Sequence, residues 1–233
     1  MSTTVYTYND KVLVNSANDK WLKKAAAPII LPANTVRVRT SNGNPPVKMS
    51  MASYETATLV TGTTDIYDVY KSGTSFKYLL YFAANVVEVI AANTTGITNM
   101  NSMFMYCSSL TTVPLFDTSS ATDMGAMFSG CTSLTSIPLF DTSDVTNLNG
   151  MAGGCTSLTT VPLFDTSSAT DMRNMFSGCT SVQSGALALY QQASGQTTPP
   201  EEHEGCFYNC GSNTVTGAAE LAQIPSSWGG TAS

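Results

Sequence analysis

Apolar and polar positions in the middle of this chain repeat with a period of 24 residues. The segment SLTTVPLFDTSSATDM occurs twice without change, at Ser109–Met124 and at Ser157–Met172, and the segment between them, Ser133–Leu148, differs at only a few positions. A fixed period of roughly 20 to 50 residues indicates a solenoid, in which each repeat is one coil of chain stacked on its neighbours. The cysteines that mark the period are Cys107, Cys131, Cys155 and Cys179.

One coil, Cys107–Gly130, begins with a pattern that predicts a short strand. Its apolar residues Leu110, Val113 and Leu115 follow the spacing LxxVxL. Side chains alternate between the two faces of a strand, so we expect these three to point inward. The alternate residues, which we expect to point outward, are Thr112, Pro114 and Phe116.

The second half of the same coil predicts a helical turn. Met124, Met127 and Phe128 are spaced i, i+3 and i+4, which places their side chains on one helical face. Thr122 is suited to cap this turn and Gly130 to end it. The DTSS sequence before it is typical of a tight turn. These elements together predict an α/β solenoid of 24-residue coils, with parallel strands plus short helical turns.

The extent of the repeat divides the chain into four predicted regions. Residues 1–27 are expected to form an N-terminal arm or anchor, and residues 28–85 a small β-rich domain with a helical cap. Residues 86–185 are expected to form the solenoid itself. Residues 186–233 are expected to supply a C-terminal helix and a capping coil, because terminal repeats must cover the open end of a stack.

Outside the coils, several shorter segments predict secondary structure. Residues 18–24 indicate a small helical piece in the arm, and SFKYLLYFAA at Ser75–Ala84 indicates a helix that caps the first coil. A further helix is predicted at Ala186–Ala193. Alternating and β-branched segments predict strands. The predicted strands are Val5–Tyr8, Lys11–Val14, Thr35–Arg39, Val47–Met51, Thr56–Val60 and Asp65–Tyr70.

The charge pattern excludes some partners. The net charge is −6, and Arg173 is the single basic residue of segment 86–233. Nucleic-acid binding requires a basic footprint, so we expect no nucleic-acid partner. No stretch approaches the ~20 apolar residues of a membrane span, so we expect no membrane partner. Met1–Asp10 lacks the basic start and apolar run of a signal peptide, so we expect synthesis and folding in a cytoplasm.

The sequence contains no recognisable catalytic motif. GxSxG, P-loop and GxGxxG patterns are all missing, so we expect no enzymatic activity. The single histidine, His203, lies among glutamates, but its spacing matches no standard metal site and we interpret it as part of a polar loop. We read the six cysteines as reduced thiols, as in cytoplasmic proteins. We therefore expect no cofactor.

The outward-facing positions of the predicted strands are the main candidate for binding. Each coil contributes a hydroxyl residue, a proline and a phenylalanine, which would form an exposed strip. Exposed apolar strips mark partner surfaces, and rows of aromatic rings suit sugars or a protein face. The alternative is that each phenylalanine packs under the next turn as part of the core. The candidate residues are Thr112, Pro114, Phe116, Ser136, Pro138, Phe140, Thr160, Pro162 and Phe164.

A column of aspartates is a second candidate. Asp117, Asp141 and Asp165 recur one coil apart, at an expected spacing of roughly 5 Å. A column of carboxylates is able to hold Ca²⁺. The alternative is that each aspartate accepts hydrogen bonds from the amides of its own turn. We favour the turn, because the column starts with the neutral Asn93 and its neighbours are threonine and serine.

The repeat phrase MFSGCTSLTSIPLFDTSDVT resembles the BspA-like leucine-rich-repeat family, including its Mycoplasma-lipoprotein type with the phrase DTSxVTxMxxMFxxC. The resemblance covers about Val86–Cys210 and implies a leucine-rich-repeat solenoid that adheres to host or glycan surfaces. The whole arrangement, with its ending AELAQIPSSWGG at Ala219–Gly230, is similar to virion and fibre proteins of phages of gut Bacteroides-type bacteria. The family motif marks core positions and therefore carries over no binding residues.

These observations lead to a functional hypothesis. We expect a phage virion component, either a head or tail fibre or a decoration protein, made in the host cytoplasm and located in the virion. Its N-terminal arm would bind other virion proteins, and its solenoid would bind host cell-surface glycan or protein. We expect a homo-oligomer, a trimer, because fibres are commonly trimeric. The alternative is a BspA-like adhesin on a bacterial cell surface.

Overall fold

The computed structural model describes residues 5–8, 11–14, 29–48 and 51–232. It divides into two compact units, Met1–Ile30 and Leu31–Ser233. In the first unit, β1 (Val5–Tyr8) pairs antiparallel with β2 (Lys11–Val14), which confirms the two strands predicted there. The helical piece predicted over residues 18–24 lies outside the described residues.

The second unit starts with a four-stranded antiparallel sheet in the order β4-β5-β3-β6. The alternating sequence of β3 buries Val36 and Val38 completely, while Arg37 on the opposite face pairs with Asp68 of β5 at 2.7 Å. The strand predicted at Val47–Met51 is not present at its described residues 47, 48 and 51. The strands are β3 (Thr35–Thr40), β4 (Thr56–Leu59), β5 (Ile66–Tyr70) and β6 (Val86–Asn93).

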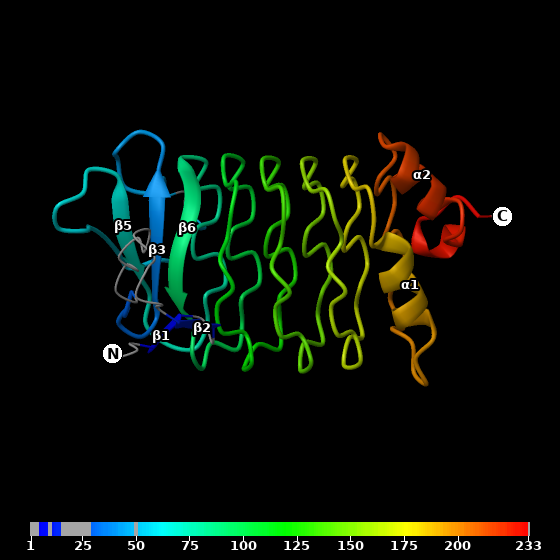
Figure 1. Cartoon of the computed structure of the whole chain (residues 1–233), viewed down its shortest axis with the longest axis horizontal. Coiled ribbons are helices and arrows are strands. Elements are labelled where there is room, and N and C mark those ends of the chain that lie inside the picture. The colour runs from blue at the N-terminus through cyan, green and yellow to red at the C-terminus, as the bar shows by residue number, and fades with distance from the viewer. Residues whose placement is uncertain (1–4, 9–10, 15–28, 49–50, 233) are drawn as a thin grey trace. The chain divides into compact units, whose positions relative to one another are not determined.

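Strand β6 joins this sheet to a stack of coils (Figure 1). One of its edges pairs antiparallel with β3. On the other edge, Glu88 forms a parallel bridge to Thr112, and the Val89 N–H donates to the Thr112 carbonyl at 3.1 Å. The coils that follow lie side by side, and corresponding residues of neighbouring coils are 24 positions apart as far as Asp171.

One side of each coil, the turn side, is tied to the next coil through its backbone. In the segment Asn99–Tyr106, every second N–H donates to a carbonyl of the segment Asp123–Gly130, with N···O distances of 2.7 to 2.9 Å. The same pattern is present from coil to coil along the stack. The turn-side segments are Ser75–Phe82, Asn99–Tyr106, Asp123–Gly130, Asn147–Gly154 and Asp171–Gly178.

The turn side is not helical, contrary to the prediction. Each turn-side segment has two residues with positive φ four positions apart, such as Ser102 (55°) and Tyr106 (62°). A left-handed residue cannot continue a right-handed helix. Alternate N–H groups therefore bond to the neighbouring coil, and those between them close short turns within their own coil, as Met103 N–H does on the Met100 carbonyl at 3.2 Å. Ser75–Ala84 is likewise not a capping helix, because Ser75 bridges Asn99 and the segment supplies the first turn side.

The opposite side of each coil, the Pro side, does not form continuous parallel strands. Its contacts between coils include isolated bridges, such as Thr160 to Ser184. Proline has no N–H to donate to a neighbouring strand. Two residues after Pro138, the N–H of Phe140 donates back to the Pro138 carbonyl at 2.9 Å and is therefore not available to a neighbouring coil. The Pro-side segments are Leu110–Phe116, Leu134–Phe140 and Leu158–Phe164.

The predicted fold class is therefore wrong. A leucine-rich-repeat solenoid of parallel strands plus short helical turns is not what the structure contains. Within its described residues, the regular elements are the β1–β2 hairpin, the small antiparallel sheet, two short α-helices and one 3-10 turn. The 24-residue repeats are instead built of turns, which are closed by hydrogen bonds within a coil, and of isolated bridges and alternate N–H bonds between coils.

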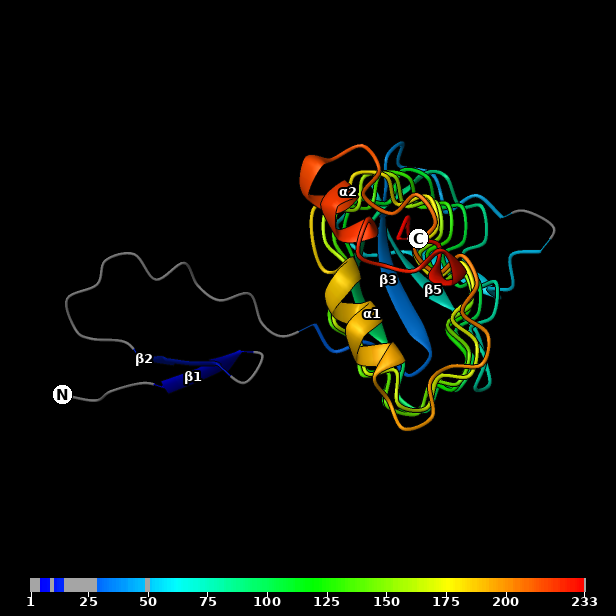
Figure 2. The same ribbon diagram turned by 90° about the vertical axis from the view of Figure 1, so that its right-hand side faces the viewer.

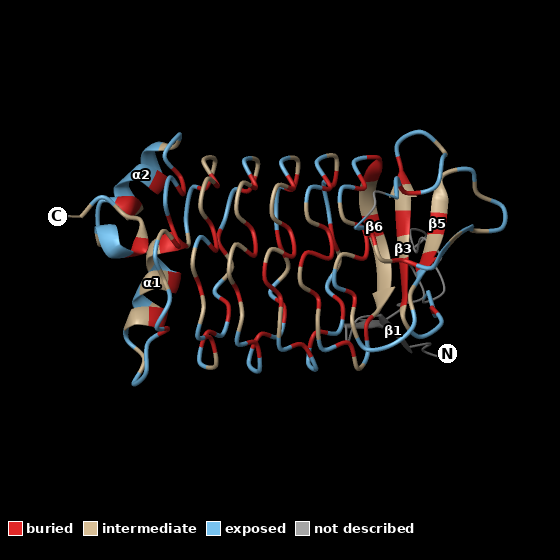
Figure 3. Cartoon of the chain, turned by 180° about the vertical axis from the view of Figure 1, so that it is seen from behind, coloured by how far each residue is buried: buried red, intermediate tan, exposed pale blue. Residues whose placement is uncertain are grey.

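The hydrophobic core lies inside the coils, at the same places in successive repeats (Figure 3). The cysteine, methionine and first leucine columns that the repeat predicted as core are completely buried, for example at Cys131, Met124 and Leu110. Burial of such side chains stabilises a fold by about 1.5 to 3 kcal/mol each. The repeated apolar columns are thus the main source of stability in the stack.

Helices close the C-terminal end of the stack (Figure 2). Helix α1 (Ala186–Ser194) confirms the predicted helix, and it is followed by α2 (Val215–Leu221) and a 3-10 turn at Ser226–Trp228. The Gln192 side chain donates to the Phe164 carbonyl at 2.7 Å, which ties α1 to the Pro-side segment Leu158–Phe164. No helix in the described part of the chain is long and apolar enough to cross a membrane.

Candidate functional site

The predicted binding strip has its aromatic residues inside the molecule. Phe116, Phe140 and Phe164 are only 8, 2 and 0% exposed, so the expectation of an exposed aromatic row is wrong and its alternative, a core position, is correct. The preceding residues Leu115 and Leu139 were expected inside but are 66 and 61% exposed. The turn closed between Pro138 and Phe140 breaks the alternation of a strand, which exchanges the places of the leucine and the phenylalanine.

The other members of the predicted strip do lie at the surface. Their hydroxyl residues are exposed and their prolines are half-buried. Together with the exposed leucines they form a continuous row of like residues, which we call the Thr-Pro-Leu strip. It consists of Thr112, Pro114, Leu115, Ser136, Pro138, Leu139, Thr160, Pro162 and Leu163.

The aspartate column stabilises turns. The Asp117 carboxylate accepts hydrogen bonds from the Ser119 N–H at 3.1 Å and the Ser119 hydroxyl at 2.7 Å, and Asp165 accepts from the Ser167 N–H at 2.8 Å. Hydrogen bonding from Ser119 holds the pKa of Asp117 below its usual value. The equivalent Asp141 accepts from Ser143 in the same way, which confirms the turn interpretation. Among the described residues, no three His, Cys, Asp or Glu side chains are grouped to hold a metal ion.

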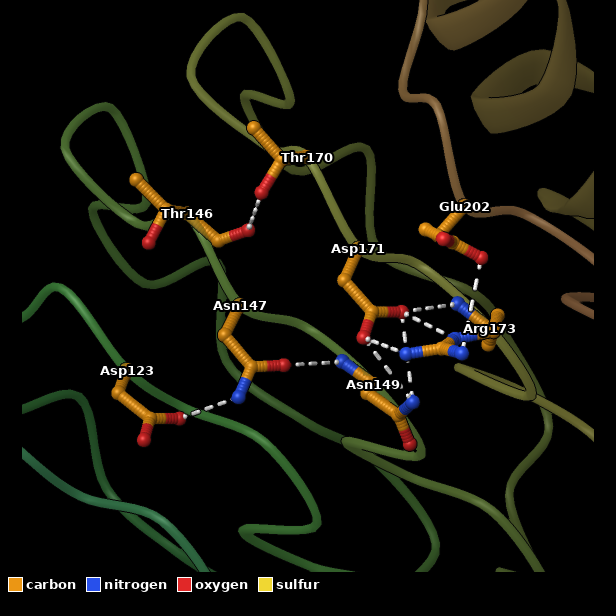
Figure 4. A network of polar contacts seen from close by, with 8 residues as sticks. All are labelled: Asp123, Thr146, Asn147, Asn149, Thr170, Asp171, Arg173 and Glu202. Atoms are coloured by element: carbon orange, nitrogen blue, oxygen red, sulfur yellow. Dashed lines mark hydrogen bonds and ion pairs between the residues drawn. The ribbon is translucent and has the colours of Figure 1, made fainter.

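A polar ladder on the turn side was missed by the sequence reasoning (Figure 4). The Asp123 carboxylate accepts hydrogen bonds from three side-chain amides: Asn99 at 3.2 Å, Asn101 at 3.2 Å and Asn147 at 2.9 Å. The amides separate the carboxylates of the column, which limits repulsion between like charges along the stack. The signal was present in the sequence, since position 123 and its equivalents alternate between asparagine and aspartate. The residues of this column are Asn99, Asp123, Asn147 and Asp171.

The ladder ends at an ion pair. Arg173 pairs with Asp171 at 2.7 Å and with Glu202 of the next coil at 3.6 Å. Burial raises the pKa of the Asp171 carboxyl, but hydrogen bonds from Arg173 and Asn149 outweigh it and hold that pKa below its usual value. The one basic residue of segment 86–233 therefore neutralises the last carboxylates of this column.

The histidine and the cysteines pack against other residues of the protein in a way that suits a structural role. The His203 ring stacks on Trp228 with centroids 4.2 Å apart, and its Nδ1 lies 3.1 Å from the Pro200 carbonyl oxygen. All six cysteines are free and buried. The Cys131 thiol donates to the Phe104 carbonyl at 3.1 Å, and burial raises the pKa of the equivalent Cys107 to about 12. These thiols are therefore protonated and shielded, as in a core.

The fold defines a repeat protein whose coils are joined edge to edge by their backbones. A family model described as "Mycoplasma protein of unknown function, DUF285" matches residues 64–189, which is more than half of the chain. The chain belongs to this Mycoplasma-type repeat family, which is related to BspA-like repeats. The match includes Ser75–Phe82, in agreement with its place as the first turn side. No curated protein and no solved structure matches the chain.

Proposed function

We propose that this protein is an attachment protein, which displays its stack of coils on a particle and binds a host cell surface through the Thr-Pro-Leu strip. The observation that carries the proposal is the repetition of the same exposed side chains in successive coils. Leu115, Leu139 and Leu163 are 66, 61 and 52% exposed, although burying them would have been favourable. Rows of exposed apolar side chains mark partner surfaces.

The particle in this proposal is a phage virion, in which a head or tail fibre or decoration protein binds host glycan or protein. The division into two units supports it, because Met1–Ile30 forms a unit of its own, which would serve as the anchor to virion proteins. The similarity of the whole arrangement to virion proteins supports it further. A homotrimer is part of this proposal.

The alternative is an adhesin on a bacterial cell surface. The family match favours this alternative, because its description names a protein of Mycoplasma, a cellular organism. Both versions share the attachment role of the strip and differ only in what carries the protein.

Two measurements test the proposal. The first is mass spectrometry of purified phage particles from a lysed culture that expresses this chain. We expect the protein in the particles at a fixed copy number. If the protein is absent from the particles and is labelled on the surface of intact bacterial cells, the virion version is contradicted and the alternative of a bacterial adhesin is supported.

The second measurement is binding of the purified chain to host cells. A variant with Leu115, Leu139 and Leu163 all changed to serine is expected to lose binding by about tenfold or more, since it removes the apolar surface that the strip would bury against a partner. Val215→Ser is the matched control, because Val215 is 90% exposed but lies on α2, away from the strip. Equal binding by the triple variant and the control would remove the strip from the proposal.

A further inference from the structure

Four aromatic rings form a cluster at the N-terminal end of the turn side. The ring centroids of Phe82 and Tyr106 are 4.4 Å apart, those of Tyr81 and Phe82 are 4.8 Å apart, and those of Tyr78 and Tyr81 are 5.4 Å apart. Phe82 and Tyr106 are 39 and 37% exposed, and the other two rings are half-buried. This aromatic cluster therefore presents a surface, in contrast to the phenylalanines of the Pro side.

Three members of the cluster have an unfavourable backbone. Tyr78, Phe82 and Tyr106 have φ of 59°, 60° and 62°, a left-handed conformation that is an outlier for bulky side chains. Later coils place glycine where Phe82 and Tyr106 stand, with φ between 72° and 74°. The coil therefore forms the same turn with glycine at this position and does not need the rings. Backbone strain that is retained where the fold does not require it is typical of functional sites. The glycines are Gly130, Gly154 and Gly178.

The next coil supports the cluster. A Cβ placed on Gly130 would lie 2.4 Å from a ring carbon of Tyr106, so that ring covers the backbone of Gly130. Tyr106 is thus held between Gly130 and Phe82. A fixed ring loses little conformational freedom when it binds a ligand, which favours affinity.

A lysine gives the cluster a charge. The exposed Lys77 places its ammonium 5.2 Å from the centroid of the Tyr78 ring. Within the described part of the chain, the ion pairs involve arginines and leave Lys77 without a carboxylate partner. An unpaired cation beside a row of rings complements a ligand with an apolar face and a negative group.

We propose that the aromatic cluster, with Lys77, binds an acidic oligosaccharide. The C–H face of a pyranose ring would lie on Phe82 and Tyr106, because the negative face of an aromatic ring attracts these hydrogens. A carboxylate or sulfate group of the sugar would pair with Lys77. The inference goes beyond the proposed function, since the cluster lies on the turn side and shares no residue with the Thr-Pro-Leu strip.

The experiment is a glycan array probed with the full chain, on which sialylated, uronate-containing and sulfated oligosaccharides stand beside their neutral parents. We expect binding to at least one acidic member over its neutral parent. Titration of that member in solution then compares the parent chain with its variants. No binding to any acidic member, or equal binding to its neutral parent, would overturn the inference.

The variants make use of the glycines of the later coils. Phe82→Gly and Tyr106→Gly should raise the dissociation constant about tenfold or more, while the thermal midpoint stays equal or rises, because glycine already occupies this place elsewhere. Lys77→Gln should reduce the preference for the acidic member. Tyr208→Ala is the control, because Tyr208 is 58% exposed but lies in the last coil, and its affinity should not change. Unchanged affinity in both glycine variants would overturn the proposal, whatever the strip variant does on cells.

Discussion

The two sides of each coil hold the stack together by different means. On the turn side, the segment Asp123–Gly130 donates four backbone N–H groups to the next coil. On the Pro side, the segment Leu134–Phe140 donates one to its neighbour, from Thr135 to Thr111 at 3.5 Å, and it buries Phe140 instead. Backbone geometry therefore constrains the turn side in addition to the burial of residues such as Met124, whereas burial is the main constraint on the Pro side. Amino-acid substitutions that preserve the fold must therefore keep positive-φ positions and hydrogen bonds on the turn side, and buried apolar side chains on the Pro side.

The largest effect should come from the Pro side. Phe140→Ala is expected to lower the free energy of unfolding by about 3 to 5 kcal/mol, because it removes a buried ring that contacts Phe116 and Phe128. Leu139→Ala should change it by less than about 0.5 kcal/mol, because Leu139 is exposed. Urea denaturation measures both. Equal losses for these adjacent residues would contradict the orientation of the Pro side.

A smaller effect is expected in the polar ladder of the turn side. Asp123→Ala should lower the free energy of unfolding by about 1 to 3 kcal/mol, because it leaves the half-buried amides of Asn99, Asn101 and Asn147 without their acceptor. Asp117→Ala is the control, with a loss of about 0.5 kcal/mol, because Asp117 is exposed and its carboxylate accepts from Ser119 of its own turn. A loss at Asp123 no greater than that at Asp117 would show that the ladder adds nothing to stability.

Backbone strain on the turn side predicts two changes of opposite sign. Gly154→Ala should destabilise the protein by about 1 to 2 kcal/mol, because φ is 74° there. A new Cβ at Gly154 would meet no atom closer than 3.8 Å, so no clash adds to this cost. Ala126→Gly, at φ 52°, should stabilise it by up to about 1 kcal/mol. Thermal unfolding of the two variants gives the signs, and a loss in both would argue against a left-handed Ala126.

The smallest effect concerns pH. The pKa of Asp171 is lowered in the folded protein by Arg173 and Asn149, so its contribution to stability is present above the unfolded pKa of about 3.9 and is lost as the pH falls through the folded value. The free energy of unfolding, measured by urea denaturation, should therefore fall between about pH 5 and pH 3, by less than about 1 kcal/mol for this one group. Asp171→Asn should show a shallower fall. The same pH dependence in both proteins would remove Asp171 from the explanation.

Much of the core was accessible from the sequence, but the candidate site was not. The columns of Leu110, Met124 and Cys131 are buried as predicted, because their apolar character does not depend on how the backbone bonds. Strand β3 and helix α1 were also found, since their patterns are local. The prediction was wrong for the leucine and phenylalanine that follow each proline, such as Leu139 and Phe140, because a turn after Pro138 shifts the alternation by one position. The alternation rule assumes an unbroken strand.

The period of 24 residues already implied that like residues meet in stacked coils, because identical segments must bury identical faces. It did not say whether each N–H bonds within its own coil or to the next, since both arrangements share the same period and the same buried columns. That choice depends on neighbouring coils that lie far away in sequence. In the tertiary structure, hydrogen bonds between coils take the place of the predicted helical turns, and Phe82 and Tyr106 lie in a strained, exposed cluster. The leucines that follow each proline point outward along the Pro side.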